Sequence, residues 1–136
     1  MALGQNMNRG LVDLLKQLPD DVTVVVELYR ALFSGRFWVL AQHTDHFHAT
    51  QFLTYPAADG ARELPVFTSA DRELLVDLHR QVSAAEVREV DGRTLWPRLI
   101  DVLDSDTFVA VDAAEKHGIR LSKAMIMGFV KLHGER

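Results

Sequence analysis

The first third of the chain carries two runs of apolar residues spaced like the buried face of a helix. In the first run, leucines recur at helical spacing before Pro19 ends it: Leu11, Leu14, Leu15 and Leu18. The second run covers residues 21–34, where the apolar side chains again fall on one helical stripe although its opening is β-branched. Asp20 or Asp21 can cap this run and Gly35 can end it, so we predict a second helix.

Three short apolar runs follow, and their patterns are typical of strands. Residues 37–41 are apolar on both alternations, which predicts a strand covered on both faces. Residues 50–55 and 64–68 are two further strands, and Asp59-Gly60 between them is a turn signal that predicts a hairpin. Pro65 cannot donate to a backbone ladder, which places it at a strand start or at a sheet edge.

The middle of the chain predicts two helices separated by a short strand. Val66 or Phe67 supplies a core side chain. Thr68 and Asp71 then have the spacing of an imperfect capping box, followed by inward apolar residues at Leu74, Leu75, Leu78 and Val82. Residues 86–90 form a short strand closed by Asp91-Gly92. Thr94 can cap the next helix, which puts Pro97 in its first turn and gives a buried stripe of Leu95, Trp96, Leu99, Val102 and Leu103.

The last third of the chain predicts a central strand and a closing helix. Residues 107–111 are wholly apolar, and a loop through Gly118 leads to Ile119 and Leu121. Ser122 can cap a final helix that Gly134 stops, with Leu121 packed on Ile126. Together these elements predict an α+β fold: a single domain over residues 1–136, with a mixed sheet of about five strands and helices packed on both faces. Residues 1–7 are expected to be a flexible N-terminus.

Composition and charge narrow the classes of function. A chain of 136 residues fits one domain, and its lack of cysteine excludes disulfides, thiolate catalysis and zinc–thiolate sites. The net charge of −4 and the scattered Lys and Arg residues argue against nucleic acid and anionic membranes as partners. The N-terminus has no signal-peptide pattern and no apolar run is long enough to span a membrane, so we expect a cytoplasmic protein.

One histidine-rich segment is a candidate metal site. His43, Asp45, His46 and His48 are all metal-ligand types, and His46 and His48 would share one face of a strand. The alternative interpretation is a polar loop whose histidines face water. Because no further ligand residues lie nearby in the sequence to complete a site, we expect no high-affinity metal site and keep the four residues as weak candidates.

Residues suited to catalysis have competing structural roles. None of the serines lies in a Gly-x-Ser-x-Gly elbow, and Ser69 and Ser122 are suited to helix starts. Glu27, Asp101, Asp104 and Asp106 could pair as acids, but the three aspartates fall at a helix end and the following turn, where solvated carboxylates are common. No Gly-rich phosphate loop is present. Met125 and Met127 could line a binding groove, although the favoured interpretation is core. We therefore predict no catalytic residue and no cofactor.

Three stretches carry a resemblance to a known family. They are residues 28–39 (LYRALFSGRFWV), Asp59-Gly60 with residues 64–69 (LPVFTS), and residues 108–122, which end in GIRLS. In this order they resemble the helix-to-strand entry, the hairpin and the closing strand of the SseB N-terminal domain family, named after the enhanced-serine-sensitivity protein. The family often has an Asn-Pro-Gly turn after the closing strand, where this chain has Val111-Asp112-Ala113.

The resemblance implies a fold more than an activity. Members of the family are associated with bacterial stress phenotypes or, by name, with type III secretion, and the resemblance brings no catalytic residues with it. We therefore expect a non-catalytic bacterial protein-interaction module, an adaptor or regulator that binds a protein partner or itself, with a homodimer as one variant. The alternative hypothesis, from a different class, is a small-ligand or metal-binding sensor that uses the His43–His48 loop.

Overall fold

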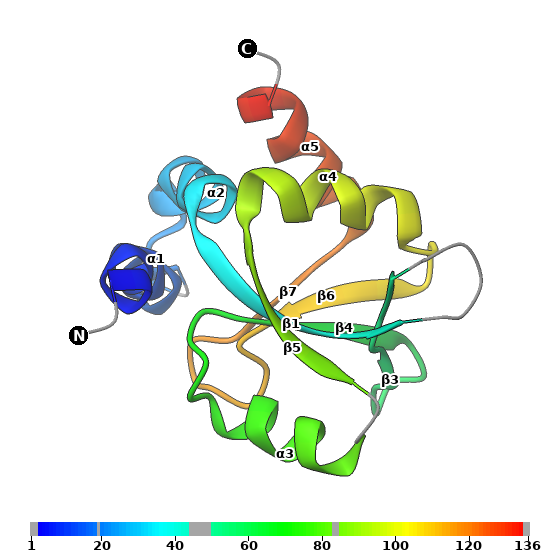
Figure 1. Ribbon diagram of the computed structural model, residues 1–136. Helices are drawn as coiled ribbons and strands as arrows, with labels where there is room; N and C mark the ends of the chain where they lie inside the picture. Colours follow the sequence, from blue (N-terminus) through cyan, green and yellow to red (C-terminus); the bar gives the residue numbers. More distant parts are fainter. Residues whose placement is uncertain (1–2, 19, 44–49, 83–84, 135–136) are drawn as a thin grey trace.

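The computed structural model describes residues 3–18, 20–43, 50–82 and 85–134 (Figure 1). In chain order the elements are α1 (Leu3–Gln17), η1 (Val22–Val24), α2 (Val25–Ser34), β1 (Arg36–His43), β2 (Thr50–Phe52), β3 (Tyr55–Pro56), β4 (Arg62–Phe67), α3 (Glu73–Gln81), β5 (Glu86–Asp91), α4 (Gly92–Val102), β6 (Thr107–Val111), β7 (Ile119–Leu121) and α5 (Lys123–Gly134). α1 begins at Leu3, so most of the segment expected to be a flexible N-terminus is helical. None of the described helices is both long and apolar enough to cross a membrane.

The strands form one mixed sheet. Trp38 of β1 pairs with Phe67 of β4 and also with Glu89 of β5, so β4 and β5 lie on opposite sides of β1. β6 runs parallel to β4, and β7 closes the far side antiparallel to β6. The short β2 pairs antiparallel with the last residues of β1, and the short β3 pairs antiparallel with the first residues of β4. The α+β class and the mixed sheet predicted from the sequence are confirmed.

Helices cover both faces of this sheet, as predicted (Figure 1). Along β1, Phe37 and Val39 join a large core that also contains side chains of α1, α2, α4 and α5. Leu40, on the other alternation, joins a smaller core under α3 with Phe67 and Leu75. The period of two in a strand divides its apolar residues between the two cores, and this explains why residues 37–41 read as apolar throughout.

One aromatic side chain connects the helices of the large core. Trp96 of α4 is fully buried and lies edge-on to Phe37, with 5.3 Å between ring centroids, and to Phe129 of α5, with 5.4 Å. Its indole Nε1 donates a hydrogen bond of 2.7 Å to the carbonyl oxygen of Leu32 in α2. Because the polar edge of the ring has a partner, burying it costs little, and the ring holds α2, α4, α5 and β1 together.

The predicted turn at Asp59-Gly60 is confirmed, whereas the predicted position of Pro65 at a strand start or a sheet edge is wrong. Gly60 has a φ of +88°, which glycine adopts without steric cost, between the paired strands β3 and β4. Pro65, however, lies in the interior of the sheet, paired with Ala110 of β6. On the other side of β4, pairing with β3 ends at Glu63 and pairing with β1 starts at Val66. Pro65 therefore sits where the partner strand changes, so the ladder does not need its missing donor.

Two predicted helix caps are wrong. α3 begins at Glu73 with Arg72 at its N-cap position, and the Arg72 side chain makes no capping hydrogen bond, so Thr68 does not start this helix. α4 is capped by Asp91, whose carboxylate accepts a hydrogen bond from the Thr94 amide at 3.0 Å, and Pro97 lies inside the helix. The early start follows from Gly92, where a Cβ would meet the Leu32 carbonyl oxygen at 2.4 Å, so only glycine permits this approach to α2.

Two further predictions about side chains have opposite outcomes. Val102 is 49% exposed and not part of the buried stripe, because α4 ends there and the chain turns away. Ser122 does cap α5, accepting a hydrogen bond from the Met125 amide at 3.2 Å. Leu121 and Ile126 are both fully buried in the large core, as expected for a hydrophobic staple.

Phe67→Ala should lower the free energy of unfolding by about 3–5 kcal/mol, because Phe67 is fully buried in the small core with Leu40, Leu75 and Ala85. Val76→Ala on the exposed side of α3 is the control and should change stability by less than about 0.5 kcal/mol. Urea unfolding of both variants measures the difference. A loss below about 1 kcal/mol for Phe67→Ala would contradict a core role.

Candidate functional site

Polar side chains converge where the parallel strands β4 and β6 end. Val66 of β4 pairs with Val111 of β6, so the residues that follow these strands, Thr68 and Asp112, come close together. The carboxyl ends of parallel strands are a frequent location for ligand sites in α/β proteins. This end of the sheet is therefore the first place to look for chemistry.

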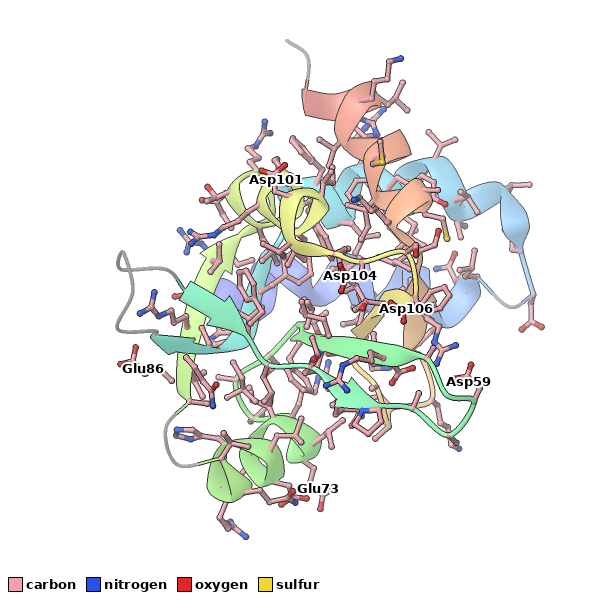
Figure 2. The ribbon with its side chains drawn as sticks, turned by 90° about the vertical axis from the view of Figure 1, so that its right-hand side faces the viewer. Asp59, Glu73, Glu86, Asp101, Asp104 and Asp106 are labelled. Atoms are coloured by element: carbon pink, nitrogen blue, oxygen red, sulfur yellow. The ribbon has the colours of Figure 1, made fainter. Side chains whose placement is uncertain are left out.

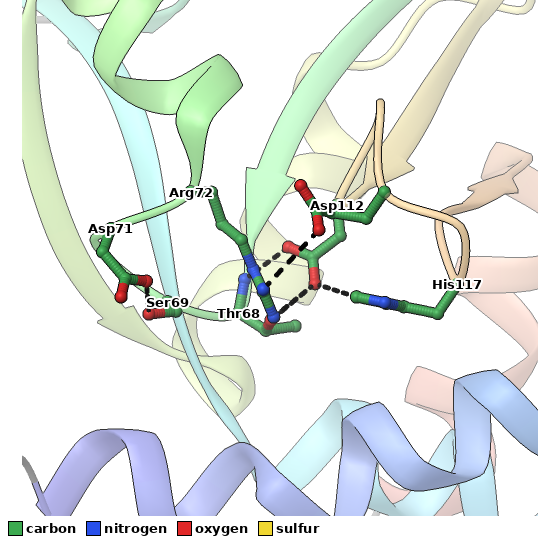
Figure 3. Close-up of polar contacts among 7 residues, drawn as sticks. Thr68, Ser69, Asp71, Arg72, Asp112 and His117 are labelled. Atoms are coloured by element: carbon green, nitrogen blue, oxygen red, sulfur yellow. Dashed lines mark hydrogen bonds and ion pairs between the residues drawn. The ribbon is translucent and has the colours of Figure 1, made fainter.

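Asp112 is the centre of this group (Figure 3). Its carboxylate is fully buried and accepts hydrogen bonds from the Thr68 amide at 2.8 Å, the Thr68 hydroxyl at 2.5 Å and Nε2 of His117 at 2.6 Å. Arg72 adds an ion pair, with 3.2 Å between its Nη2 and the Asp112 Oδ2. A buried carboxylate needs this many donors to offset the loss of its hydration. We call Thr68, Arg72, Asp112 and His117 the Asp112 cluster.

The backbone at Asp112 explains why an acidic residue suits this turn. Asp112 has a φ of +51°, a left-handed conformation that Asp and Asn tolerate better than most residues. Its amide donates to the Val66 carbonyl oxygen at 2.8 Å, which continues the β4–β6 pairing by one residue. The same residue thus ends the parallel pair and directs its carboxylate onto the chain that follows β4.

The order of contacts in the Asp112 cluster differs from that of a nucleophilic triad. In a triad, the histidine lies between the carboxylate and the hydroxyl and removes the hydroxyl proton. Here the carboxylate lies between Thr68 and His117, so the histidine is not placed to activate the hydroxyl. Thr68 and His117 are also 1% and 7% exposed, which keeps substrate away from both. The Asp112 cluster is therefore a set of internal contacts that joins the segment before α3 to the loop before β7.

Two flanking contacts complete this region. The Ser69 hydroxyl donates to the Asp71 carboxylate, and α3 begins only at Glu73, so the prediction that Ser69 starts this helix is wrong. Arg72 also reaches Glu115 at 3.9 Å, and its Nε is buried with no hydrogen-bond partner among the described residues. Arg72 therefore stands at the outer side of the cluster, between Asp112 and solvent.

The sequence-predicted metal candidates fall largely outside the described residues. His43 ends β1, and the positions of Asp45, His46 and His48 lie in the segment that the structure does not describe. Within the described ranges, no group of three or more His, Asp or Glu side chains is arranged to hold a metal ion. The metal-sensor hypothesis therefore stays a prediction.

The acidic residues considered for catalysis lie at the surface (Figure 2). Asp101, Asp104 and Asp106 are all exposed, at the end of α4 and in the turn before β6, as expected for solvated carboxylates. A tighter group forms around Arg120 of β7, which contacts Asp59 at 2.7 Å and Glu63 at 2.8 Å. The hydrogen bond from Arg120 lowers the pKa of Asp59 to about 2, while burial and the neighbouring Glu63 raise the pKa of Tyr55 to about 12. These contacts fasten the β3–β4 hairpin to β7.

A surface groove lies between α4 and α5 on the opposite side of the large core from the sheet. It has a volume of about 610 Å³ and is mostly apolar, lined by Phe33, Arg93, Pro97, Ile100, Met127, Gly128, Val130 and Lys131. Met127 is 49% exposed, and Met125 on the same helix is 39% exposed. The interpretation of both methionines as core is therefore wrong, because α5 uses Ile126 and Phe129 for the core and turns the methionines outward.

Comparison with models of known protein families gives a match. The model of the SseB protein N-terminal domain matches residues 11–127, which is most of the chain. The chain belongs to the SseB N-terminal domain family. A search of curated proteins and a search of solved structures each found no match. The family resemblance stated from the sequence is confirmed, and the match runs from within α1 to the middle of α5.

In this SseB-family chain, sequence reasoning missed the Asp112 cluster and favoured a core role for Met127, which lines the groove. A usable signal for the cluster was present, because Thr68 and Asp112 each follow an apolar strand directly. It required knowing that the two strands are parallel neighbours, and Thr68 was instead assigned to a helix cap. The signal for the groove was the nearly continuous apolar composition of residues 124–132, which exceeds what one buried face needs.

Asp112→Asn should lower the free energy of unfolding by about 2–3 kcal/mol, because it removes the charge that Arg72 and His117 pair with while tolerating the same backbone conformation. Asp106→Asn, in the exposed turn before β6, is the matched control and should change the free energy of unfolding by less than about 0.5 kcal/mol. Denaturant unfolding near neutral pH measures both. Equal free energies of unfolding for the two variants would show that the Asp112 cluster contributes nothing to stability.

Proposed function

We propose that this chain is a non-catalytic protein-interaction module that acts as an adaptor or regulator in a bacterial cytoplasm. The observation that carries the proposal is the apolar surface that α4 and α5 leave at the groove. Monomeric proteins seldom expose contiguous apolar surface without a binding role. Met127, which lines the groove, is 49% exposed, and Leu132 on the same helix is 63% exposed.

The state of the polar residues supports the non-catalytic part of the proposal. The group best placed for chemistry, the Asp112 cluster, uses its carboxylate for internal contacts with Thr68, Arg72 and His117. A catalytic group must present a reactive atom to a substrate. The association with stress or with secretion is part of the proposal and rests on the family resemblance.

Strand addition at a sheet edge is a weaker route to a partner than the groove. The sheet edge that the sequence suggested at Pro65 is absent, because β4 lies between β1 and β6 inside the sheet. β5 forms one edge, and its outward residues include charges held in ion pairs between Arg88 and Glu86 and between Arg36 and Glu89. Charged side chains on edge strands discourage the addition of another strand. The groove is therefore the better candidate surface.

Affinity capture tests the proposed function directly. The tagged domain, incubated with lysate of its source organism, should retain a small, reproducible set of proteins by quantitative mass spectrometry, while a resin carrying an unrelated acidic domain should not. Light scattering of the same preparation reports whether the partner is a second copy. The proposal fails if the domain is monomeric, retains nothing reproducibly, and is instead stabilised strongly by a compound in a metabolite or metal-ion thermal-shift screen.

A further inference from the structure

The groove between α4 and α5 continues into a basic recess. Phe33 and Arg93 line the apolar groove and also line a smaller hollow of about 160 Å³ beside it, together with Arg30, Ser34 and His133. The Arg93 guanidinium lies over the Phe33 ring at 5.5 Å, and the His133 ring lies 6.3 Å from the same ring. Apolar and cationic surfaces thus meet at Phe33.

The cations of this recess have no carboxylate partners within the described residues. Four other arginines pair with acidic side chains: Arg36, Arg72, Arg88 and Arg120. No such pair forms at Arg30, Arg93 or Lys131 in the described part of the chain. His133 Nε2 is also buried there with no hydrogen-bond partner among the described residues. A buried polar atom without a partner costs free energy, which a hydrogen bond to a bound polar group would recover.

We propose that this continuous surface binds an amphipathic helix of a protein partner, with the apolar side of that helix in the α4–α5 groove and acidic side chains at one end in the recess. The proposal rests on the proposed function and names its binding site and partner class. A helix laid between two helices presents apolar residues every three or four positions to such a groove. Carboxylates complement Arg30, Arg93 and His133, and this complementarity sets the orientation of the bound helix.

Charge and shape favour this occupant over two others. A symmetric pair of copies would bring two cationic recesses into one interface, which like charges oppose. A fatty acid has the right chemistry, an apolar chain with a carboxylate, but small-ligand sites enclose most of the ligand surface. This groove lies open along the surface, which suits a helix that keeps its outer side in water.

Gly128 offers a way to block the groove without disturbing the fold. It lies inside α5 and lines the groove, and a Cβ placed there would meet no other atom within 4 Å. Gly128→Leu should therefore fold at least as well as the parent, because leucine favours a helix more than glycine does. Gly10→Leu is a matched control, since Gly10 is also an exposed helical glycine with no atom within 4 Å of an added Cβ, in α1.

The test is a selection from a displayed library of random 16-residue peptides. The parent domain is the target, and Gly128→Leu is used to remove peptides that bind elsewhere. We expect the recovered peptides to repeat apolar residues at helical spacing and to carry Asp or Glu at one end. Recovery of no Gly128-dependent peptide, or recovery of basic ones, would contradict the proposal.

The affinities of one selected peptide for domain variants then test the groove and the recess separately. Fluorescence anisotropy should show binding weakened about tenfold or more by Gly128→Leu and by Arg93→Glu, but unchanged by Gly10→Leu. Dodecanoate is the competing probe, and the helix proposal is wrong if it binds the groove more tightly than every selected peptide does. If the peptides fail while affinity capture retains a partner at another face, the proposed function stands and only this site is lost.

Discussion

The packing of Trp96 is the interaction on which the rest of the helical layer depends. Its ring lies against Phe37 of the sheet and Phe129 of α5, and its indole nitrogen bonds the Leu32 carbonyl of α2. These contacts place α4 beside α5 and leave their outer apolar residues at the surface. The groove is therefore a consequence of how the core packs.

The Asp112 cluster lies at the carboxyl ends of β4 and β6, and unlike the groove it pairs its polar groups with one another. Its carboxylate is surrounded by donors from the chain itself, with Thr68 and His117 on either side (Figure 3). Burying a charge in this way gives specificity of geometry more than a reactive group, and removal of one partner is costly. The Asp112 cluster thus satisfies its polar groups internally, whereas the α4–α5 face leaves both apolar and cationic groups exposed. This contrast is why we place function at the groove.

The sequence predicted much of the fold because local patterns determine it. The alternation in residues 37–41, the Asp59-Gly60 turn and the Ser122 cap each depend on neighbours in the chain, and each is confirmed. The errors at Thr68, Thr94 and Pro65 share another cause, since each depends on a contact with a distant segment. Thr68 bonds Asp112, 44 positions away, and Gly92 packs on α2, which moves the start of α4 ahead of Thr94. The apolar composition of residues 124–132 signals more apolar side chains than one buried face needs, but the pattern does not show which of them remain uncovered, so the place of the groove was not predicted.

The most direct test of this account is site-specific photo-crosslinking in the living cell. A photoreactive residue replaces Met127 in the groove or, as the matched site, Val76 on the exposed side of α3, across the sheet (Figure 1). The account predicts a discrete protein adduct from position 127 that Arg93→Glu abolishes, and no such adduct from position 76. An adduct formed equally from both positions, or from position 76 alone, would contradict the assignment of function to the α4–α5 face.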